Sequence, residues 1–466
     1  MIEHIPAVLF RILAQTPGLD RSFLVGGCVR DALLGNVPQD FDIEVFGLNY
    51  EQLAVALLPW GRTDLVGRSF GVLKLTVPDG QSFDFSIPRR DSKVAPGHKG
   101  FSIEFDPSLT PADAAARRDF TINALMLDPR TKAVLDYFGG IPDLENRILR
   151  HTTGAFREDP LRVLRGMQLV SRFALRPAAE TVVLCREMKN QFPELAGERV
   201  REEWFKWAQK STVPSAGLRF LEMTEWIDHF PEIKALRGTP QEPEWHPEGD
   251  VLTHTGHCCD ALVKLPEWRA ADVESKIVYS LAVLTHDFGK PSTTQRVEKD
   301  GRNRVISPGH EVEGVGLADA FLQRIHAPAG IRARVLPLVA NHMVHYQAVT
   351  DRAVRRLARR LEPENIHGLG IVMSADQAGR PPLPAAVSKT VQSLLSKAEE
   401  LQVKQSAARP ILQGRHLIEL GLSPGESFGT ILHGAYEAQL EGEFSDLPQA
   451  IEWLKKHSSA LLAPPR

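Results

Sequence analysis

The sequence has few cysteines, no marked excess of either charge and no long apolar run. Only four cysteines occur among 466 residues, too few for a disulfide framework and without the paired C-x-x-C spacing of a structural zinc site. The 55 Lys and Arg nearly cancel the 58 Asp and Glu, which excludes a molecule that attracts nucleic acid over its whole surface. We therefore expect any nucleic-acid site to be a local patch.

Membrane and secretion signals are also absent from the sequence. The longest apolar stretches, such as residues 277–284, fall far short of the roughly 18 to 20 residues that cross a bilayer. The first residues carry Glu3 and an arginine within an apolar stretch, unlike a secretion signal. Together with the low cysteine content, this predicts a cytoplasmic protein without a membrane partner.

The hydrophobic content of 43% and the charged content of 24% are typical of a folded globular chain. Short β-like runs at 23–25, 41–46, 71–77 and 82–87 alternate with helical segments, and later segments follow helical periodicity. We predict an α+β multidomain protein, whose expected parts are a mixed α/β domain (1–145), a helical region (146–236), a histidine-rich helical domain (237–380), and a linker with a helical tail (381–466). Residues 88–115, rich in Pro, Gly, Lys and Arg, are expected to form a long surface loop.

A glycine pair follows the first expected strand. Gly26 and Gly27 lie between that strand and a helix expected from Val29. Glycines there let the backbone approach a phosphate, and Arg30 adds a two-pronged donor. Taken alone, two adjacent glycines more often mark only a tight turn.

Acidic residues come next. Asp40 and Asp42 are two apart at the start of an expected strand, so both carboxylates point to one face about 6.6 Å apart along the strand. Such a pair suits two Mg²⁺ ions for nucleotidyl transfer, with Asp84 of another β-like run as a third acid. In isolation, Asp-x-Asp also fits the end of a turn, and Asp84 fits a solvated strand face.

A polar cluster, RRDFTINA, follows at residues 117–124. Arginines at 117 and 118 suit triphosphate oxygens, and an amide such as Asn123 suits a sugar or base edge. A surface arginine pair is the plainer interpretation.

Eight segments occur in the order seen in one known family. They are GGCVRDALLG, DFDIEVFG, GRSFGVLKL, PRRDSKVAPGHKGF, RRDFTINAL, FGGIPDLENRILRHT, FREDPLRVLRGMQLVSRFAL and GERVREEW. In this order they resemble the bacterial class II tRNA nucleotidyltransferases, the CCA-adding enzymes, and their poly(A) polymerase relatives. The resemblance covers roughly residues 1 to 235 and implies a polymerase β-like palm followed by a helical neck and body.

The resemblance implies a role for each matching residue. Asp40 and Asp42 match the metal pair, with two Mg²⁺ ions as cofactors, and the partners are tRNA, CTP and ATP. The implied nucleotide contacts are Gly26, Gly27, Arg30, Arg117, Arg118, Asp119, Asn123, Glu158, Asp159 and Arg162. Of these, Glu158, Asp159 and Arg162 resemble an amino-acid template that pairs with the base edge, because a carboxylate accepts from the exocyclic amino group of C or A. Asp159 before Pro160 also fits a helix cap.

Some questions stay open at this stage. Glu198, Arg199 and Glu202 resemble a motif that supports the template helix, and we interpret them as structural. The sequence favours full CCA addition but leaves open CC, A or poly(A) addition, and also a catalytically idle RNA-binding protein. Asp84 matches no firmly required family residue.

Histidines and aspartates cluster between residues 246 and 376. The adjacent pair His286–Asp287 follows an apolar run, and imidazoles with carboxylates form mixed sites for divalent metals. The arrangement resembles the HD superfamily of metal-dependent phosphohydrolases. The resemblance implies His254, His286, Asp287 and Asp376 as ligands, with His310 and His342 for a second metal, and a degenerate structural domain is the alternative.

A basic stripe lies in DRAVRRLARRLEPEN. The arginines at 352, 355, 356, 359 and 360 share one face of an expected helix. Such a stripe suits phosphates of the tRNA acceptor arm, although most charged faces are only solvated.

Overall fold

The computed structural model describes residues 5–38, 40–66, 71–93, 101–299, 301–344, 349–383 and 389–461. Contacts divide the chain into two compact units, Met1–His229 and Phe230–Arg466. The four-part division expected from the sequence is finer than this and stays a prediction. Within the described ranges, no helix is both long enough and apolar enough to cross a membrane.

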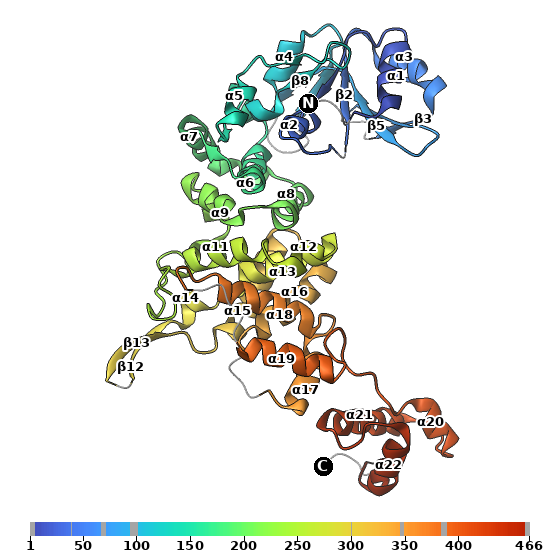
Figure 1. Cartoon of the computed structure of the whole chain (residues 1–466), viewed down its shortest axis with the longest axis vertical. Helices are drawn as coiled ribbons and strands as arrows, with labels where there is room; N and C mark the ends of the chain where they lie inside the picture. Colours follow the sequence, from blue (N-terminus) through green and yellow to red (C-terminus); the bar gives the residue numbers. More distant parts are fainter. Residues whose placement is uncertain are drawn as a thin grey trace. The chain divides into compact units, whose positions relative to one another are not determined.

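Unit 1 contains a seven-stranded mixed sheet with the strand order β3-β4-β5-β2-β1-β8-β9 (Figure 1). Only β2 and β5 pair in parallel among the neighbours of this sheet, and the other pairs are antiparallel. The strands are β1 (Ser22–Val25), β2 (Asp42–Val45), β3 (Arg62–Val66), β4 (Val72–Thr76), β5 (Ser82–Ser86), β8 (Met126–Leu127) and β9 (Val134–Leu135). The four strands expected from the sequence are therefore present, each within two residues of the expected ends.

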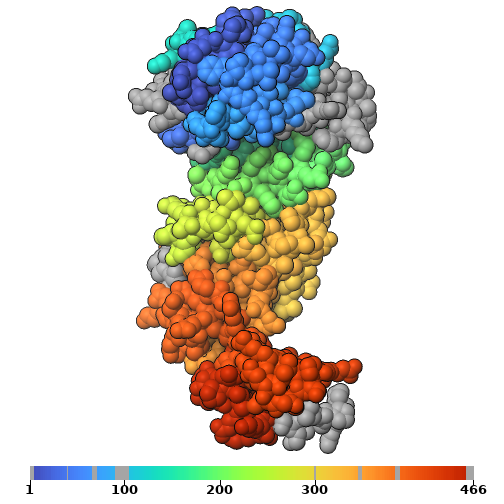
Figure 2. Space-filling view, turned by 90° about the vertical axis from the view of Figure 1, so that its right-hand side faces the viewer, coloured from blue at the N-terminus to red at the C-terminus, as the bar shows by residue number. Residues whose placement is uncertain are grey.

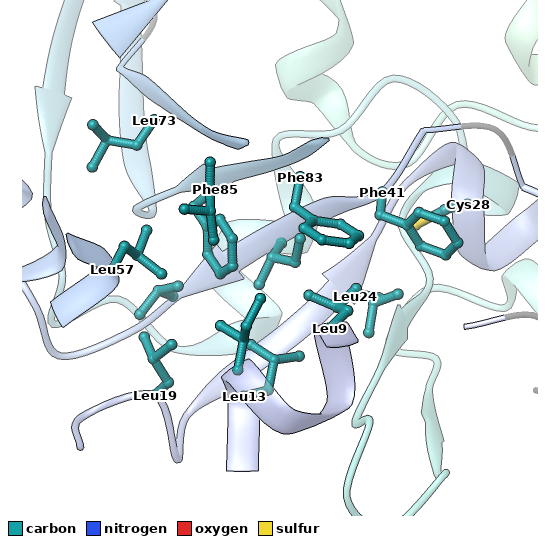
Figure 3. Close-up of a cluster of buried hydrophobic side chains, with 14 of the residues drawn as sticks. Leu9, Leu13, Leu19, Leu24, Cys28, Phe41, Leu57, Leu73, Phe83 and Phe85 are labelled. Atoms are coloured by element: carbon teal, nitrogen blue, oxygen red, sulfur yellow. The ribbon is translucent and has the colours of Figure 1, made fainter. Parts of the chain in front are cut away.

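Successive side chains of β2 point alternately to the two faces of the sheet, one of which packs in the core. Ile43 and the neighbouring Phe41 join a buried cluster with α1 (Ala7–Gln15) and α3 (Tyr50–Leu57), which cover this face of the sheet. Figure 3 shows Leu9 and Leu13 of α1 close to the aromatic side chains of this core. Full burial of one such side chain contributes roughly 1.5–3 kcal/mol. The opposite face of β2 carries Asp42 and Glu44.

The prediction of a surface loop at residues 88–115 is wrong in part. The structure has a hairpin of β6 (Arg89–Lys93) and β7 (Phe101–Phe105), followed by α4 (Pro111–Ala116). The sequence of β6, RRDSK, lacks the apolar alternation that identifies a half-buried strand. Residues 94–100 of the expected loop lie outside the described residues.

Helices complete unit 1. They are α2 (Gly27–Leu33), α5 (Gly140–Glu145), α6 (Leu161–Phe173), α7 (Ala179–Glu187), α8 (Gly197–Lys210) and α9 (Pro214–Met223). The helix α6 buries Val163, Met167 and Val170 at helical spacing and packs against α8 and α9. The short strands β10 (Ile148–Leu149) and β11 (Arg176–Pro177) also occur in this region, which the sequence predicted to be all helical.

Unit 2 is largely helical. Its helices are α10 (Pro231–Ala235), α11 (Val251–Leu262), α12 (Pro266–Ala270), α13 (Val273–Thr285), α14 (Lys290–Thr293), α15 (His310–Arg324), α16 (Ala329–Asn341), α17 (Asp351–Leu361), α18 (Ile366–Ala378), α19 (Lys389–Glu400), α20 (Gly414–Glu419), α21 (Glu426–Glu441) and α22 (Leu447–Leu461). The helix α13 packs on α11, α16 and α18, and the surfaces of the first helices (yellow-green) and of the following ones (orange) adjoin in Figure 2. One hairpin, β12 (Gln295–Lys299) with β13 (Arg302–Ile306), corrects the expectation of an all-α domain. The sequence analysis missed it because both strands are mostly polar and show no apolar alternation.

Candidate active site and metal centre

The acidic pair of unit 1 is part of a three-carboxylate arrangement. The parallel register of β2 and β5 places Asp42 directly opposite Asp84, so the third acid predicted from the sequence lies beside the first strand. Asp40 precedes the first residue of β2 and is exposed, which corrects the expectation that the strand begins there. Lys74 Nζ lies 3.3 Å from Asp84 Oδ1 and partly balances this charge.

The electrostatics of Asp42 fit a cation site. Burial raises the pKa of the Asp42 carboxyl, and the neighbouring Asp84, Asp40 and Glu44 raise it further against the opposing effect of Arg118. A carboxylate crowded by other carboxylates is stabilised by a divalent cation, and carboxylate oxygens are the ligands that Mg²⁺ prefers. The residues present therefore fit the metals that the family resemblance implies.

Glu44 is a functional residue that the sequence analysis did not single out. Its side chain is fully buried, and its two oxygens accept from Arg117 Nη2 at 2.9 Å and Arg118 Nη2 at 3.1 Å. Burial acts to raise the pKa of this carboxyl, but the two guanidiniums lower it below its usual value. Its position two residues after Asp42, on the same strand face, was the available signal. Glu44 thus fixes both arginines beside the acidic centre.

The glycine pair lies beside these arginines. Gly26 has a φ of 72°, and a Cβ built there would meet Arg118 Nη1 at 3.2 Å. The helix after it begins at Gly27, two residues before the expected start. Arg30 donates to Asn123 Oδ1 at 2.6 Å and lies over the Phe173 ring at 4.4 Å from its centroid. Burial lowers the pKa of the Arg30 guanidinium.

Asp119 is a buried member of the polar cluster at residues 117–124. Its carboxylate accepts from Phe120 N at 2.8 Å, Asn123 Nδ2 at 3.0 Å and Arg165 Nε at 2.7 Å. Burial acts to raise its pKa, but Arg165, Asn123 and Arg162 lower the pKa to about 2. Because its oxygens are engaged, Asp119 orients Asn123 and Arg165 in this structure.

These groups line one cavity of about 450 Å³. Ten arginine and lysine side chains line it against three aspartates, so the cavity favours a polyanion. The residues predicted from the sequence that line it are Gly26, Gly27, Arg30, Asp42, Arg117, Arg118, Asp119, Asn123, Asp159 and Arg162. Asp40, Asp84 and Glu158 are not among the lining residues. The sequence analysis missed Arg165, Arg172, Lys206 and Lys210, which come from the helices that follow the palm.

The predicted template residues have contacts of their own. Asp159 accepts from Leu161 N at 3.1 Å and from Arg199 Nη2 at 2.6 Å. Helix α6 begins at Leu161 with Pro160 as its N-cap, so Asp159 lies one residue before the cap, which corrects the helix-cap alternative. Arg162 donates to the carbonyl oxygens of Ala155 and Arg117, each at 2.7 Å. Arg199 therefore supports Asp159, whereas Glu198 and Glu202 are exposed on α8.

In unit 2 the predicted HD residues converge on Asp287. Its Oδ1 lies 3.3 Å from His310 Nε2 and 3.9 Å from His342 Nε2, and its Oδ2 lies 3.2 Å from His286 Nε2. His254 Nε2 is 3.7 Å from Oδ2 and 3.1 Å from Asp376 Oδ1. All six side chains are thus brought together from five separate segments.

Second contacts aim the histidines at this centre. The Nδ1 atoms of His286, His310 and His342 each lie 2.7 Å from a backbone carbonyl oxygen, which leaves every Nε2 toward Asp287. Three groups of metal-ligand type result among the described residues: His254, Cys258, His286 and Asp376; Asp287, His310 and His342; and His246, Glu248 and His254. This donor set fits divalent transition metals.

His254 has a different partner from the other three. Its Nδ1 lies 2.7 Å from Glu248 Oε1, and the same oxygen lies 2.9 Å from His246 Nδ1. Cys258 Sγ is 3.3 Å from His254 Nε2. The sequence analysis missed Glu248 and Cys258; the latter lies one turn after His254, on the same face of α11.

The basic stripe of α17 contacts the acidic side chains of α21. Arg352 and Arg356 pair with Glu441, and Arg356 Nη2 also lies 3.4 Å from Glu437. Arg359 pairs with Glu362. The stripe therefore connects two helices, and a role in binding RNA stays a prediction.

Comparisons with known proteins show which family the chain belongs to. A family model described as the poly A polymerase head domain matches residues 22–150. A multifunctional CCA protein of Xanthomonas campestris is 36% identical over 371 residues, covering 77% of this chain and 85% of the relative. The chain belongs to the multifunctional CCA proteins. This membership confirms the class II CCA-adding family inferred from the sequence motifs.

Other multifunctional CCA proteins and two solved structures extend the comparison. The protein of Xylella fastidiosa strain M12 is 33% identical over 373 residues, covering 77% of the chain and 84% of the relative. The Bacillus stearothermophilus CCA-adding enzyme in complex with CTP aligns with a TM-score of 0.65 at 19% identity, covering 98% and 99% of the chains. The Thermotoga maritima CCA-adding enzyme complexed with tRNA aligns at 0.59 and 18%, covering 98% and 97%. These two structures confirm the fold: a mixed-sheet palm followed by a largely helical region.

Proposed function

We propose that this chain adds or repairs the 3′-terminal CCA of tRNA from CTP and ATP, with release of pyrophosphate. The observation that carries the proposal is the placement of Asp42 opposite Asp84 at a cavity lined by ten cationic side chains. Its multifunctional CCA relatives and the tRNA and CTP complexes of similar fold support this substrate set.

Asp40, Asp42 and Asp84 would hold two Mg²⁺ ions, which supply charge stabilisation for the attacking 3′-hydroxyl and the leaving pyrophosphate. The chain itself positions the triphosphate. Arg117 and Arg118, fixed by Glu44, present guanidinium groups to the phosphate oxygens.

The sugar and the base are held by other groups. Asn123, oriented by Asp119 and Arg30, offers its amide to the ribose. The carboxylate of Asp159 accepts from the exocyclic amino group of cytosine or adenine, and Arg162 donates to the complementary acceptors. Both bases share this amino group, so one pair of side chains serves CTP and ATP. Glu158 is the third member of the proposed template set, although it does not line the cavity.

The direct test uses tRNA truncated at its 3′ end, incubated with Mg²⁺ and CTP, ATP or both. We expect three added nucleotides only when both are present, and none with the Asp42→Asn variant. Long adenosine tails from ATP alone would instead identify a poly(A) polymerase, and one- or two-nucleotide products would identify a CC- or A-adding enzyme.

A second function is favoured by the convergence on Asp287. We propose that His254, His286, Asp287, Asp376, His310 and His342 hold divalent metal for hydrolysis of phosphoesters such as 2′,3′-cyclic phosphates. When bound between these residues, such a metal would supply an activated water as the nucleophile. The chain fixes the imidazole directions. Against the opposing effect of burial, His286, together with Lys290 at 2.7 Å from Asp287 Oδ2, holds the pKa of that carboxyl well below its usual value. Loss of metal-dependent cyclic phosphate hydrolysis in Asp287→Asn, with nucleotide addition retained, is the expected result; no hydrolysis by the unaltered protein with any divalent metal would contradict it.

A further inference from the structure

A second pocket opens beside the histidine cluster. It has a volume of about 240 Å³, and Asp287, His310, His342 and Asp376 line it. Trp245 and the β13 residues Val305 and Ile306 line the same pocket. The proposed metal site and an aromatic side chain thus share one hollow.

Trp245 is unusually exposed for a side chain of its kind. It is 57% exposed, more than any other aromatic side chain in the described part of the chain. An exposed tryptophan that lines a pocket offers a large apolar ring face to a ligand. Such a face is what nucleic-acid bases stack on, and every base has one.

The segment that carries Trp245 is anchored. Glu242 accepts from Val305 N at 2.9 Å and from Arg304 Nη1 at 3.1 Å, and Trp245 N donates to Glu242 O at 3.0 Å. The indole is therefore presented from a turn tied to β13. Because the backbone that carries the indole is already held, a ligand that stacks on it orders little of the chain.

Charge in the same pocket complements a phosphate. Lys290 and Arg380 both line it, and Lys290 Nζ also contacts Gln241 Oε1 at 2.8 Å. A phosphoester placed at the histidine cluster would share this pocket with both cations and with the indole. Phosphate-binding and base-stacking groups in one pocket are the two kinds of group that a nucleotide needs.

We propose that Trp245 is the base-stacking platform of the hydrolase site and makes the site select phosphoesters that carry a nucleobase. The proposal rests on the proposed phosphohydrolase function for its catalytic consequence. Stacking is tolerant of base identity, so the site discriminates nucleotides from base-free phosphoesters rather than one base from another.

The experiment compares two five-membered cyclic phosphates, adenosine 2′,3′-cyclic phosphate and glycerol 1,2-cyclic phosphate, with full-length protein and Mn²⁺. Trp245→Ala should raise KM for the adenosine substrate about tenfold or more with kcat retained, because one stacked base is lost. Trp245→Phe should retain most of the affinity. Neither variant should change KM for the glycerol substrate, and Val273→Ala, at an exposed position of α13, serves as the matched control.

A binding measurement keeps the test independent of hydrolysis. Adenosine 3′-monophosphate should quench part of the tryptophan fluorescence of the metal-free protein, and the quench should disappear in Trp245→Phe although calorimetry still detects binding. Equal KM changes for both substrates, no change for either, or a quench that persists in Trp245→Phe would overturn the inference. If the unaltered protein hydrolyses neither substrate, the proposed hydrolase function fails, and the quench alone decides the stacking platform.

Discussion

At the scale of single residues, buried carboxylates hold the cationic groups of both sites. Asp119 is the clearest case, because its folded pKa of about 2 lies below the ordinary value of 3.8. A depressed pKa means that the ionised form stabilises the fold at pH values above about 4, and that this contribution is lost as the pH falls toward 2. The shift corresponds to about 2 kcal/mol.

We therefore predict that Asp119→Asn lowers the free energy of unfolding at pH 7 by about 2 kcal/mol. The difference from the unaltered protein should shrink as the pH falls from 4 toward 2. Urea unfolding at a series of pH values measures it, and a difference that stays constant down to pH 2.5 would contradict the assigned ionisation. Glu443→Gln, at a surface carboxylate of unit 2, is the control.

Glu248 is expected to tune metal binding through His254. Its oxygen accepts from His254 Nδ1 at 2.7 Å, so removing the charge weakens the donor strength of that imidazole. Glu248→Gln should weaken Co²⁺ affinity roughly 10- to 100-fold, as measured by calorimetry on the protein stripped of metal. Glu244→Gln, on the same segment but facing Arg304, should bind Co²⁺ like the unaltered protein. Equal affinity for both variants would remove Glu248 from the metal centre.

Sequence reasoning identified the residues that occur in ordered motifs, and it missed their supports. Asp42, Arg117 and His286 were predictable because each stands in a recognisable segment. Glu44 and Glu248 were not singled out, since their importance depends on partners 73 and 6 residues away that only the fold brings into contact.

At the scale of elements, apolar periodicity decided what could be predicted. The strands β4 and β5 carry clear apolar alternation and were predicted close to their observed ends. The hairpin β12–β13 reads QRVEK and RNRVI, with too few apolar residues to show alternation. Its two strands pair through the backbone rather than through an apolar face. Val305 and Ile306 of β13 line the pocket beside the histidine cluster.

The contact of α17 with α21 allows a prediction for a pair of elements. Arg356 and Glu441 are 42% and 22% exposed, so their coupling is expected to be about 0.5–1 kcal/mol. A double-mutant cycle with Arg356→Ala and Glu441→Gln measures it. If the stripe also binds tRNA, only Arg356→Ala weakens that binding, and a loss in both variants would instead reflect the helix contact.

At the scale of the whole molecule, two compact units carry two chemically different centres. One presents carboxylates and arginines, the other imidazoles together with the carboxylates of Asp287 and Asp376. The family motifs of residues 1–235 and the HD pattern predicted this pairing of functions, because each is a local sequence signature. Periodicity alone did not reveal the division at His229, since helical segments lie on both sides of it.

We expect the two activities to be separable. Asp42→Asn should reduce CCA addition at least 100-fold and leave cyclic phosphate hydrolysis within twofold, because its carboxylate lies in unit 1 only. Asp287→Asn should give the reverse pattern. Parallel assays on one preparation of each variant measure this, and loss of both activities in either variant would show that the centres depend on each other.

The backbone conformation at Gly26 also limits which residues can replace glycine at this position. A side chain there meets an unfavourable φ of 72° and the Arg118 guanidinium at once, whereas Gly35, with a φ of 77°, faces open space. In a library of all single substitutions selected for tRNA repair, position 26 should accept glycine alone, while asparagine survives at position 35. The loop at Gly26 is thus expected to tolerate no other residue, whereas the turn at Gly35, which also has a positive φ, is expected to vary.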